Sequence, residues 1–185
     1  MILRFLSPAL LVLLVIGAGC TADPAMDPAV QIAQTDTPLI APEALASYIP
    51  SGPIGWRLLA PPAPATLEED GAPLVSVTAS YLPDNDPNGT NNRSADIVVQ
   101  DTAGQSIGLL RLVGLLPDVP ADGTNPVQTT LRGRPAVVLT GEQMIRAYLV
   151  VDGRYVVHLT ITDGVQSDFD AFVAALDLEG LSSLR

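Results

Sequence analysis

The sequence contains no lysine, one cysteine and one histidine, and only 4% of its residues are aromatic. Because Cys20 is the only thiol, a disulfide within the folded domain and a cysteine-based metal site are both excluded. A zinc site also lacks ligands, since His158 is the only imidazole. With so few aromatic rings, the core has to be built from Val, Leu, Ile and Ala.

Positive charge is also scarce. Nine basic residues, all Arg, stand against 20 acidic residues, and the formal net charge is −11. Such a surface repels phosphate backbones, so no nucleic-acid partner is expected. The acidity is compatible with cations or basic proteins as partners, and it also serves to keep a domain soluble.

The N-terminus has the pattern of an export signal. Met1–Phe5 carries one positive charge at Arg4, and Leu6–Ile16 is almost wholly apolar. That apolar length is typical of a signal peptide and is short for a membrane span. Small residues at positions 17 to 19 then precede Cys20, as a signal peptidase requires. We therefore expect residues 1–19 to be a signal peptide.

Gly17-Ala18-Gly19-Cys20 resembles the lipobox of prokaryotic lipoproteins, in which small residues precede a lipidated cysteine. The sequence departs from that pattern at Gly17, where the family usually has Leu or another aliphatic residue. The resemblance implies a mature protein that begins at Cys20, carries a lipid there, and is anchored to the cell membrane facing the extracytoplasmic side. A plain signal peptide cut nearby and an uncleaved N-terminal anchor are the alternatives.

The residues after Cys20 divide into a tether and one domain. Residues 20–42 are rich in Ala, Asp, Pro and Thr and lack a sustained apolar period, which predicts a flexible, lipid-anchored tether. Residues 43–185 have the length of a single globular domain.

Periodicity and turn residues predict the elements of that domain. Alternating apolar and polar residues over 74–82 are the strongest strand signal. We expect helices over 42–49, 105–116 and from Ser167 to near Gly180, and strands over 56–59, 74–82, 95–101, 127–131, 135–140, 147–151 and 154–162.

Asp152-Gly153 favours a two-residue type I′ turn between the last two strands. That turn would place Val151 opposite Arg154 and Tyr148 opposite Val157. It therefore predicts that Tyr148 shares the core face with Tyr155 and Val157.

These elements predict an α+β fold: an antiparallel sheet of about five to seven strands, with an N-terminal and a C-terminal helix packed on it. The run 150–162, a short helix and Ala175-Leu176-Asp177-Leu178 resemble uncharacterised prokaryotic lipoproteins. At fold level the arrangement is similar to PsbP-like domains, sandwiches of helix-flanked antiparallel sheets. The resemblance covers about the last third of the chain and contains no diagnostic motif, so it implies a fold and no function.

No constellation of catalytic residues emerges. His158 has no recognisable nucleophile context and is expected to be a strand residue beside Thr160, satisfied by a hydroxyl or by water. Glu68-Glu69-Asp70 is expected to be a solvated loop, although paired carboxylates in a cleft would suit a hydrolase. We assign no catalytic residue and no tightly bound cofactor.

The loop after residue 83 is a candidate calcium site. Its start fits D-x-[DN]-x-[DN]-G, in which alternating oxygen side chains converge on a hard cation. The EF-hand pattern fails at its twelfth position, Ala95, and the alternative is a loop of ordinary turn residues. The candidate ligands are Asp84, Asp86, Asn88, Thr90, Asn92 and Asp96.

The same loop contains two N-x-[ST] triplets, beginning at Asn88 and Asn92, which are candidate glycosylation sites. From the predicted export signal and the composition together, we expect a non-enzymatic binding or assembly-accessory domain held at the membrane through Cys20, with an envelope protein as its partner. An envelope hydrolase that uses carboxylates in a cleft is the competing hypothesis.

Overall fold

The computed structural model describes residues 37–86, 90–116 and 126–184. The chain separates into two units, Met1–Gln31 and Ile32–Arg185, and the fold described here belongs to the second. The predicted signal peptide, Cys20 and most of the predicted tether lie outside the described residues. Over the part that is described, no helix has both the length and the apolar character that crossing a membrane requires.

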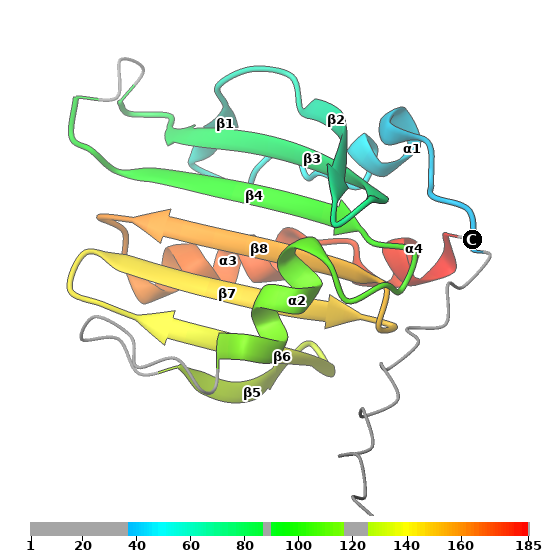
Figure 1. The fold of residues 1–185 in the computed structure, drawn as a ribbon. Helices are drawn as coiled ribbons and strands as arrows, with labels where there is room; N and C mark the ends of the chain where they lie inside the picture. The colour runs from blue at the N-terminus through cyan, green and yellow to red at the C-terminus, as the bar shows by residue number, and fades with distance from the viewer. Residues whose placement is uncertain (1–36, 87–89, 117–125, 185) are drawn as a thin grey trace, which may run out of the picture. The chain divides into compact units, whose positions relative to one another are not determined.

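An eight-stranded antiparallel sheet forms the body of the domain (Figure 1). Its order is β1-β3-β4-β8-β7-β6-β5, and β2 pairs with β3 beside β1. The strands are β1 (Trp56–Leu58), β2 (Ala63–Glu69), β3 (Ala72–Pro83), β4 (Ser94–Asp101), β5 (Val127–Leu131), β6 (Arg134–Thr140), β7 (Met144–Val151) and β8 (Tyr155–Thr162). The α+β class and the antiparallel sheet are thus confirmed.

The predicted range of five to seven strands was too small, because β2 was missed. The prolines before and within it, and its acidic end, indicated a loop. β2 lies at the edge of the sheet and pairs only with β3, from Ala63 opposite Thr78 to Glu69 opposite Ala72. An edge strand tolerates proline, because one side of its backbone has no partner strand.

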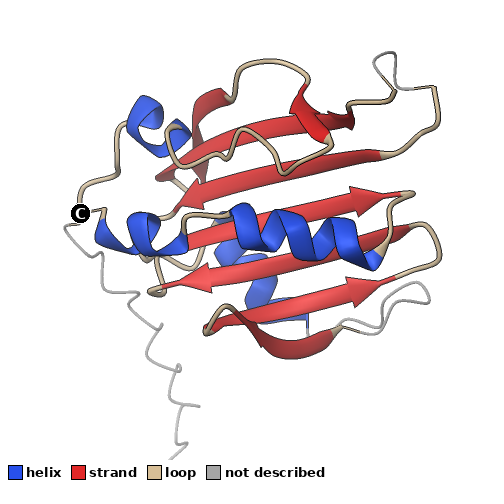
Figure 2. Cartoon of the chain, turned by 180° about the vertical axis from the view of Figure 1, so that it is seen from behind, coloured by secondary structure: helices blue, strands red, loops and turns tan. Residues whose placement is uncertain are grey.

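Four helices accompany the sheet: α1 (Pro42–Ala46), α2 (Gly108–Leu115), α3 (Gln166–Ala175) and α4 (Leu178–Ser183). Figure 2 shows α3 and α4 lying across one face of the sheet, with α2 on the face behind. The single helix expected from Ser167 to Gly180 is two helices. The chain is extended at Leu176, and Asp177 then caps α4 by accepting a hydrogen bond from the Gly180 N–H at 2.8 Å.

The core lies between the sheet and α1, α3 and α4. Phe172 of α3 is fully buried and contacts Trp56 and Tyr81 edge-to-face, at ring-centre distances of 5.2 and 5.0 Å. Phe169, Val173 and Leu176 are buried as their helical spacing predicted. The alternation along β3 is also confirmed, since Val77, Ala79 and Tyr81 all join this core.

The last hairpin differs from its predicted register by one residue. Asp152 and Gly153 both have positive φ, at 53° and 66°, and the Arg154 N–H donates to Val151 O, as in a type I′ turn. Tyr155, however, pairs with Val151, so Arg154 is an extra residue in the hairpin. A one-residue shift exchanges the faces of a strand, and Tyr148 therefore lies opposite His158, away from the core.

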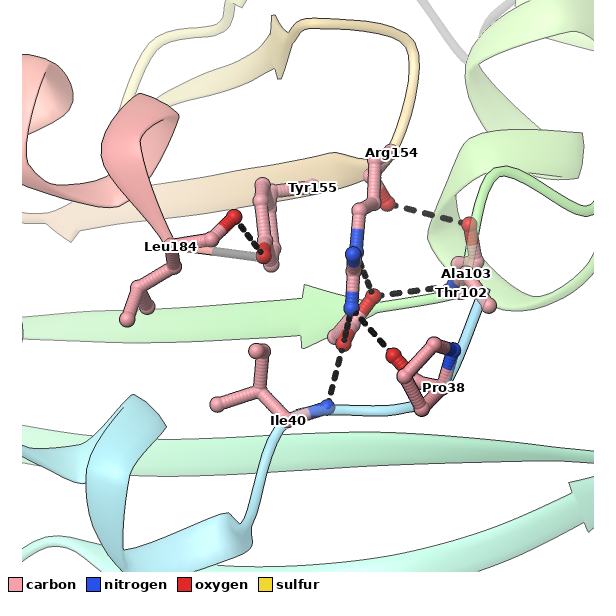
Figure 3. A network of polar contacts seen from close by, with 8 residues as sticks. Pro38, Ile40, Thr102, Ala103, Arg154, Tyr155 and Leu184 are labelled. Carbon is pink, nitrogen blue, oxygen red and sulfur yellow. Dashed lines mark hydrogen bonds and ion pairs between the residues drawn. The ribbon is translucent and has the colours of Figure 1, made fainter. Parts of the chain in front are cut away.

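The extra residue binds a buried carboxylate (Figure 3). Asp101 at the end of β4 is fully buried and accepts bonds from Arg154 Nε at 2.8 Å and from an Arg154 terminal nitrogen at 2.7 Å. It also accepts from the backbone N–H of Ile40 and of Ala103, both at 2.9 Å. Arg154 in turn donates to Pro38 O at 2.7 Å. Residues 38–40, which the sequence places in the tether, are thus fastened to the domain.

Replacing Asp101 with Asn should lower the free energy of unfolding by about 3 kcal/mol, because the buried Arg154 charge loses its counter-ion. Asp70→Asn is the matched control. Its partner Arg111 is half exposed, so we expect a loss below about 1 kcal/mol. Urea unfolding followed by Trp56 fluorescence measures both values. Equal losses would show that the buried pair contributes no more than an exposed one.

Candidate functional site

The face of the sheet opposite the core carries a row of polar side chains. Pairing of β3, β4, β8 and β7 aligns Ser80, Asp96, Thr160 and Arg146 in one row across the four strands. The Ser80 hydroxyl donates to Asp96 Oδ1 at 2.5 Å, and Arg146 is exposed. We call the outward side chains of these four strands the open face.

His158 occupies the neighbouring row of the open face. Its ring stacks on Tyr148 across the strand pair, with ring centres 4.3 Å apart and planes 4° from parallel. The Thr160 hydroxyl lies 3.1 Å from its Nε2. The hydroxyl contact expected for His158 from the sequence is therefore confirmed.

The pKa of His158 is lowered from 6.5 to about 4, mainly by burial and also by the Arg146 charge, whereas Asp96 acts in the opposite direction. The imidazole is therefore neutral at pH 7. A general base works best when its pKa lies near the operating pH, so this ring is a weak base for activating Thr160. Asp96, the nearest candidate to orient the ring, is already bound to Ser80. The geometry is that of a hydrogen-bonding surface.

α2 covers one end of the same face. Its inward residues Leu109, Val113 and Leu116 pack against a small cluster of Val137, Leu139 and Tyr148. In Figure 1, α2 crosses in front of the sheet over β7 and β6, while β3, β4 and the far ends of β7 and β8 stay uncovered. The open face is therefore bounded on one side by a helix.

The acidic run of the sequence helps to hold α2 in place. Glu69 accepts a hydrogen bond from the Gly108 N–H at 2.9 Å, and Gln100 accepts one from the Leu109 N–H at 2.8 Å. These side chains satisfy N–H groups that a helix start leaves without partners. Asp70 pairs with Arg111 at 2.6 Å. Glu69 and Asp70 are thus engaged by α2, where the sequence predicted a solvated loop.

The candidate calcium ligands lie in different surroundings. Asp86 is buried, and its carboxylate accepts hydrogen bonds from the Thr90 N–H, the Thr90 hydroxyl and the Asn91 N–H, between 2.9 and 3.0 Å. Asp96 is bound to Ser80 on the open face. These contacts are those of local turn chemistry.

The other candidate ligands of that loop are exposed or lie outside the described residues. Asp84 and Asn92 are both exposed, and the backbone N–H of Asp84 donates to Gly55 O. Asn88, a candidate for calcium and for glycosylation, lies outside the described residues. No group of three or more acidic, His or Cys side chains suited to a metal occurs among the residues described. Calcium binding and glycosylation at Asn92 stay predictions.

The sequence did not predict the polar site formed by Arg93, Asp168 and Trp56. Arg93, just before β4, donates to Asp168 at 2.5 Å and lies over the Trp56 ring, 5.1 Å from its centre. Asp168 also accepts from the Val165 N–H and so caps the start of α3. Burial raises the pKa of Asp168, but bonds from Arg93 and Val165 outweigh burial and hold it below its usual value.

The described surface includes three cavities that His158 does not line. One of about 460 Å³ lies beside α2 between Asp70 and Arg111. A second, of about 290 Å³, lies between α2 and β5, and a third, of about 460 Å³, lies between β5 and α3. The only carboxylate in the first cavity is Asp70, which is paired with Arg111.

The sequence matches no protein-family model, and comparisons with curated proteins and with solved structures also give no match. Function therefore has to be argued from the chain itself.

The free energy of unfolding should fall between pH 6.5 and pH 4 because of His158. Over that range the unfolded chain takes up a proton that the native ring, with a pKa of about 4, does not accept. The difference between the pKa of His158 in the unfolded and in the native state corresponds to about 3 kcal/mol of free energy of unfolding, since one pKa unit is worth about 1.4 kcal/mol. Above pH 6.5 both states are neutral and the effect vanishes.

Urea unfolding at several pH values, for the wild type and for His158→Gln, isolates this contribution. The carboxylates titrate in both proteins, so their effect cancels in the difference. The variant should show the shallower decline. Parallel curves for the two proteins would show that His158 titrates normally in the native state.

Proposed function

We propose that this chain is a lipid-anchored extracytoplasmic protein whose domain binds an envelope protein through the open face of its sheet. The observation that carries the proposal is the row Ser80–Asp96–Thr160–Arg146, together with the neutral His158 beside it. A sheet with one face packed by helices and the other lined by hydrogen-bonding side chains offers a surface for recognition.

The shape of the open face favours a macromolecular partner. Small ligands bind in concave sites that enclose most of their surface, whereas protein interfaces are broader and about as polar as the rest of a surface. The two cavities next to α2 lie beside the open face, and the polar row lines neither of them. Hydroxyl groups along neighbouring strands can donate and accept hydrogen bonds over such a broad contact.

The charge of the open face is also suited to a protein partner. The whole chain has a net charge of −11, but the outward residues of β3, β4, β7 and β8 include one acid, Asp96, and one base, Arg146. The face is therefore locally neutral on an acidic protein. A neutral contact area avoids the desolvation of many like charges, and the surrounding acidity discourages other acidic proteins.

The N-terminal sequence supports a membrane location for this activity. Small residues before Cys20 provide the lipidation signal, and residues 20–36 are long enough to let the domain stand clear of the lipid head groups. The domain end of this tether is defined by the bonds of Asp101 and Arg154 to residues 38–40. Anchoring and partner binding are thus assigned to different parts of the chain.

Changing Cys20 to Ser should release the domain from the membrane or leave an uncleaved precursor, because the acceptor of the lipid is lost. Detergent-phase partitioning and intact mass spectrometry of the wild type and the variant provide the measurement. Identical partitioning, with no lipid mass on either protein, would rule out the lipoprotein assignment and leave the binding proposal standing.

The binding face is tested with a photocrosslinking residue placed at Thr78, an exposed outward position of β3, in the full chain in its native envelope. It should form one defined protein adduct that disappears when Arg146→Glu makes the face acidic. The same residue at Thr66, an exposed position on β2, is the matched control.

Adducts of equal yield at both positions, or an adduct insensitive to Arg146→Glu, would refute the proposed face. Turnover of a substrate by the purified chain alone, abolished by Glu69→Gln, would instead favour the hydrolase hypothesis.

A further inference from the structure

β5 forms one edge of the sheet, and no described strand pairs with its outer side. Residues 127–130 are exposed, Leu131 is half-buried, and Val127 keeps 57% of its surface accessible. The outward N–H and C=O groups of such an edge are a template for another strand.

The opposite edge of the sheet carries the features that prevent strand addition. β2 contains Pro64, which has no N–H, and ends in Glu68 and Glu69. Prolines and charges on edge strands are common means of blocking unwanted pairing. β5, with the sequence Val-Gln-Thr-Thr-Leu, has neither. The β5 edge therefore lacks the features that hinder strand addition at β2.

Both faces of the sheet are hollow beside β5. On the core side, a cavity of about 460 Å³ is lined by Leu131, Arg132, Phe169 and Val173. On the open-face side, a cavity of about 290 Å³ is lined by Val113, Gly114, Gln128 and Val137. Helices α2 and α3 thus stop short of the last strand. A strand added to β5 would bring side chains to both hollows at once.

We propose that β5 pairs in antiparallel fashion with β5 of a second copy of this chain, with Thr129 of each copy on the two-fold axis. This register places Val127 opposite Leu131 of the second copy, and Gln128 opposite Thr130. The strand is self-complementary in this arrangement. Val127 and Leu131 meet on the core side, flanking the Thr129 pair, and Gln128 and Thr130 meet on the open-face side. Each copy thus contributes the same residues, as an isologous interface requires.

Backbone geometry selects the same register. Arg132 and Gly133 form a two-residue turn with φ of 48° and 77°, closed by the pair Leu131–Arg134. The closing residues of such a hairpin bond to each other, and bonded positions then alternate along the strand. The backbone groups of Gln128 and Thr130 therefore point outward, and the two-fold pairing makes these two residues exchange hydrogen bonds between copies.

The dimer explains the exposed apolar residue and the charge of this edge. Val127 of the second copy would lie beside Leu131, at the mouth of the cavity lined by Phe169 and Val173. Two copies of a chain of net charge −11 repel each other, but β5 itself is uncharged. Arg132 lies next to β5, and its side chain donates to backbone carbonyls of α3, including Ala174 O at 3.4 Å. Electrostatic repulsion therefore opposes the approach of two copies least when they meet through this edge.

A two-fold axis perpendicular to the sheet would join the two sheets edge to edge, with both open faces on the same side. If the open face binds as proposed above, the dimer presents two binding faces together and gains avidity for a repeated partner. The pairing of β5 does not depend on that function.

The test introduces Thr129→Cys into the full chain and oxidises intact cells with copper phenanthroline. Opposed Cα atoms at a non-hydrogen-bonded pair lie about 4.5 Å apart, within the range that a disulfide spans. We expect a disulfide-linked dimer on a non-reducing gel. Thr66→Cys on the blocked β2 edge is the matched control and should give only the background of the unmodified chain.

Two further variants separate pairing at β5 from any other association. Thr130→Pro removes an outward N–H without disturbing the bonds to β6, and Gln128→Lys adds a charge to the edge. Each should abolish the Thr129→Cys dimer. A dimer that survives both changes, or a Thr129→Cys dimer no stronger than that of Thr66→Cys, would overturn the proposal. Dimers already present in the unmodified chain would instead report a free Cys20 thiol, and so a failure of lipidation.

Discussion

Side chains on β3, β4, β7 and β8 alternate between the two faces of one antiparallel sheet, and the remaining features of the domain follow from that division. The inward set is almost entirely apolar and supplies the surface on which α1, α3 and α4 are packed. With few aromatics in the chain, Trp56, Tyr81 and Phe172 gather at one place in this core, where large rings bury the most surface. The outward set is then free to be polar, and it forms the open face.

Charge in this protein is used mainly to join segments that are distant in sequence. Asp101 and Arg154 connect β4, the last hairpin and residues 38–40, and Arg93 and Asp168 connect the start of β4 with α3. Glu69 and Asp70 hold the start of α2. Arginine suits these positions because its planar group donates several bonds in fixed directions, so one side chain can satisfy a carboxylate and a carbonyl together.

The proposed surfaces lie apart from these ion pairs, although on the open face Ser80 is bonded to Asp96 and Thr160 to His158. The open face has a row of hydrogen-bonding side chains that no helix covers, and the β5 edge has exposed backbone groups between two hollows. In the proposed arrangement the face would serve recognition and the edge assembly, so a partner and a second copy would not compete for the same residues. The proposed lipidation site, Cys20, lies apart from both in the sequence.

Local patterns in the sequence determined the class of fold, most of the strands and the amphipathic part of α3, because periods of 2 and 3.6 residues reflect burial on one side of an element. They also indicated that His158 would meet a hydroxyl, since Thr160 lies on the same strand face. Tertiary structure decided the rest. Arg154 leaves the regular hairpin register to reach Asp101, which moves Tyr148 to the open face, and no local signal reports a contact between residues 53 positions apart. β2 forms despite Pro64 only because β3 offers a partner at an edge of the sheet. The acidic run is held in place because α2 packs back against it and Gly108 N–H donates to Glu69. In each case the deciding energy comes from a group far along the chain, which a pattern in neighbouring residues does not contain.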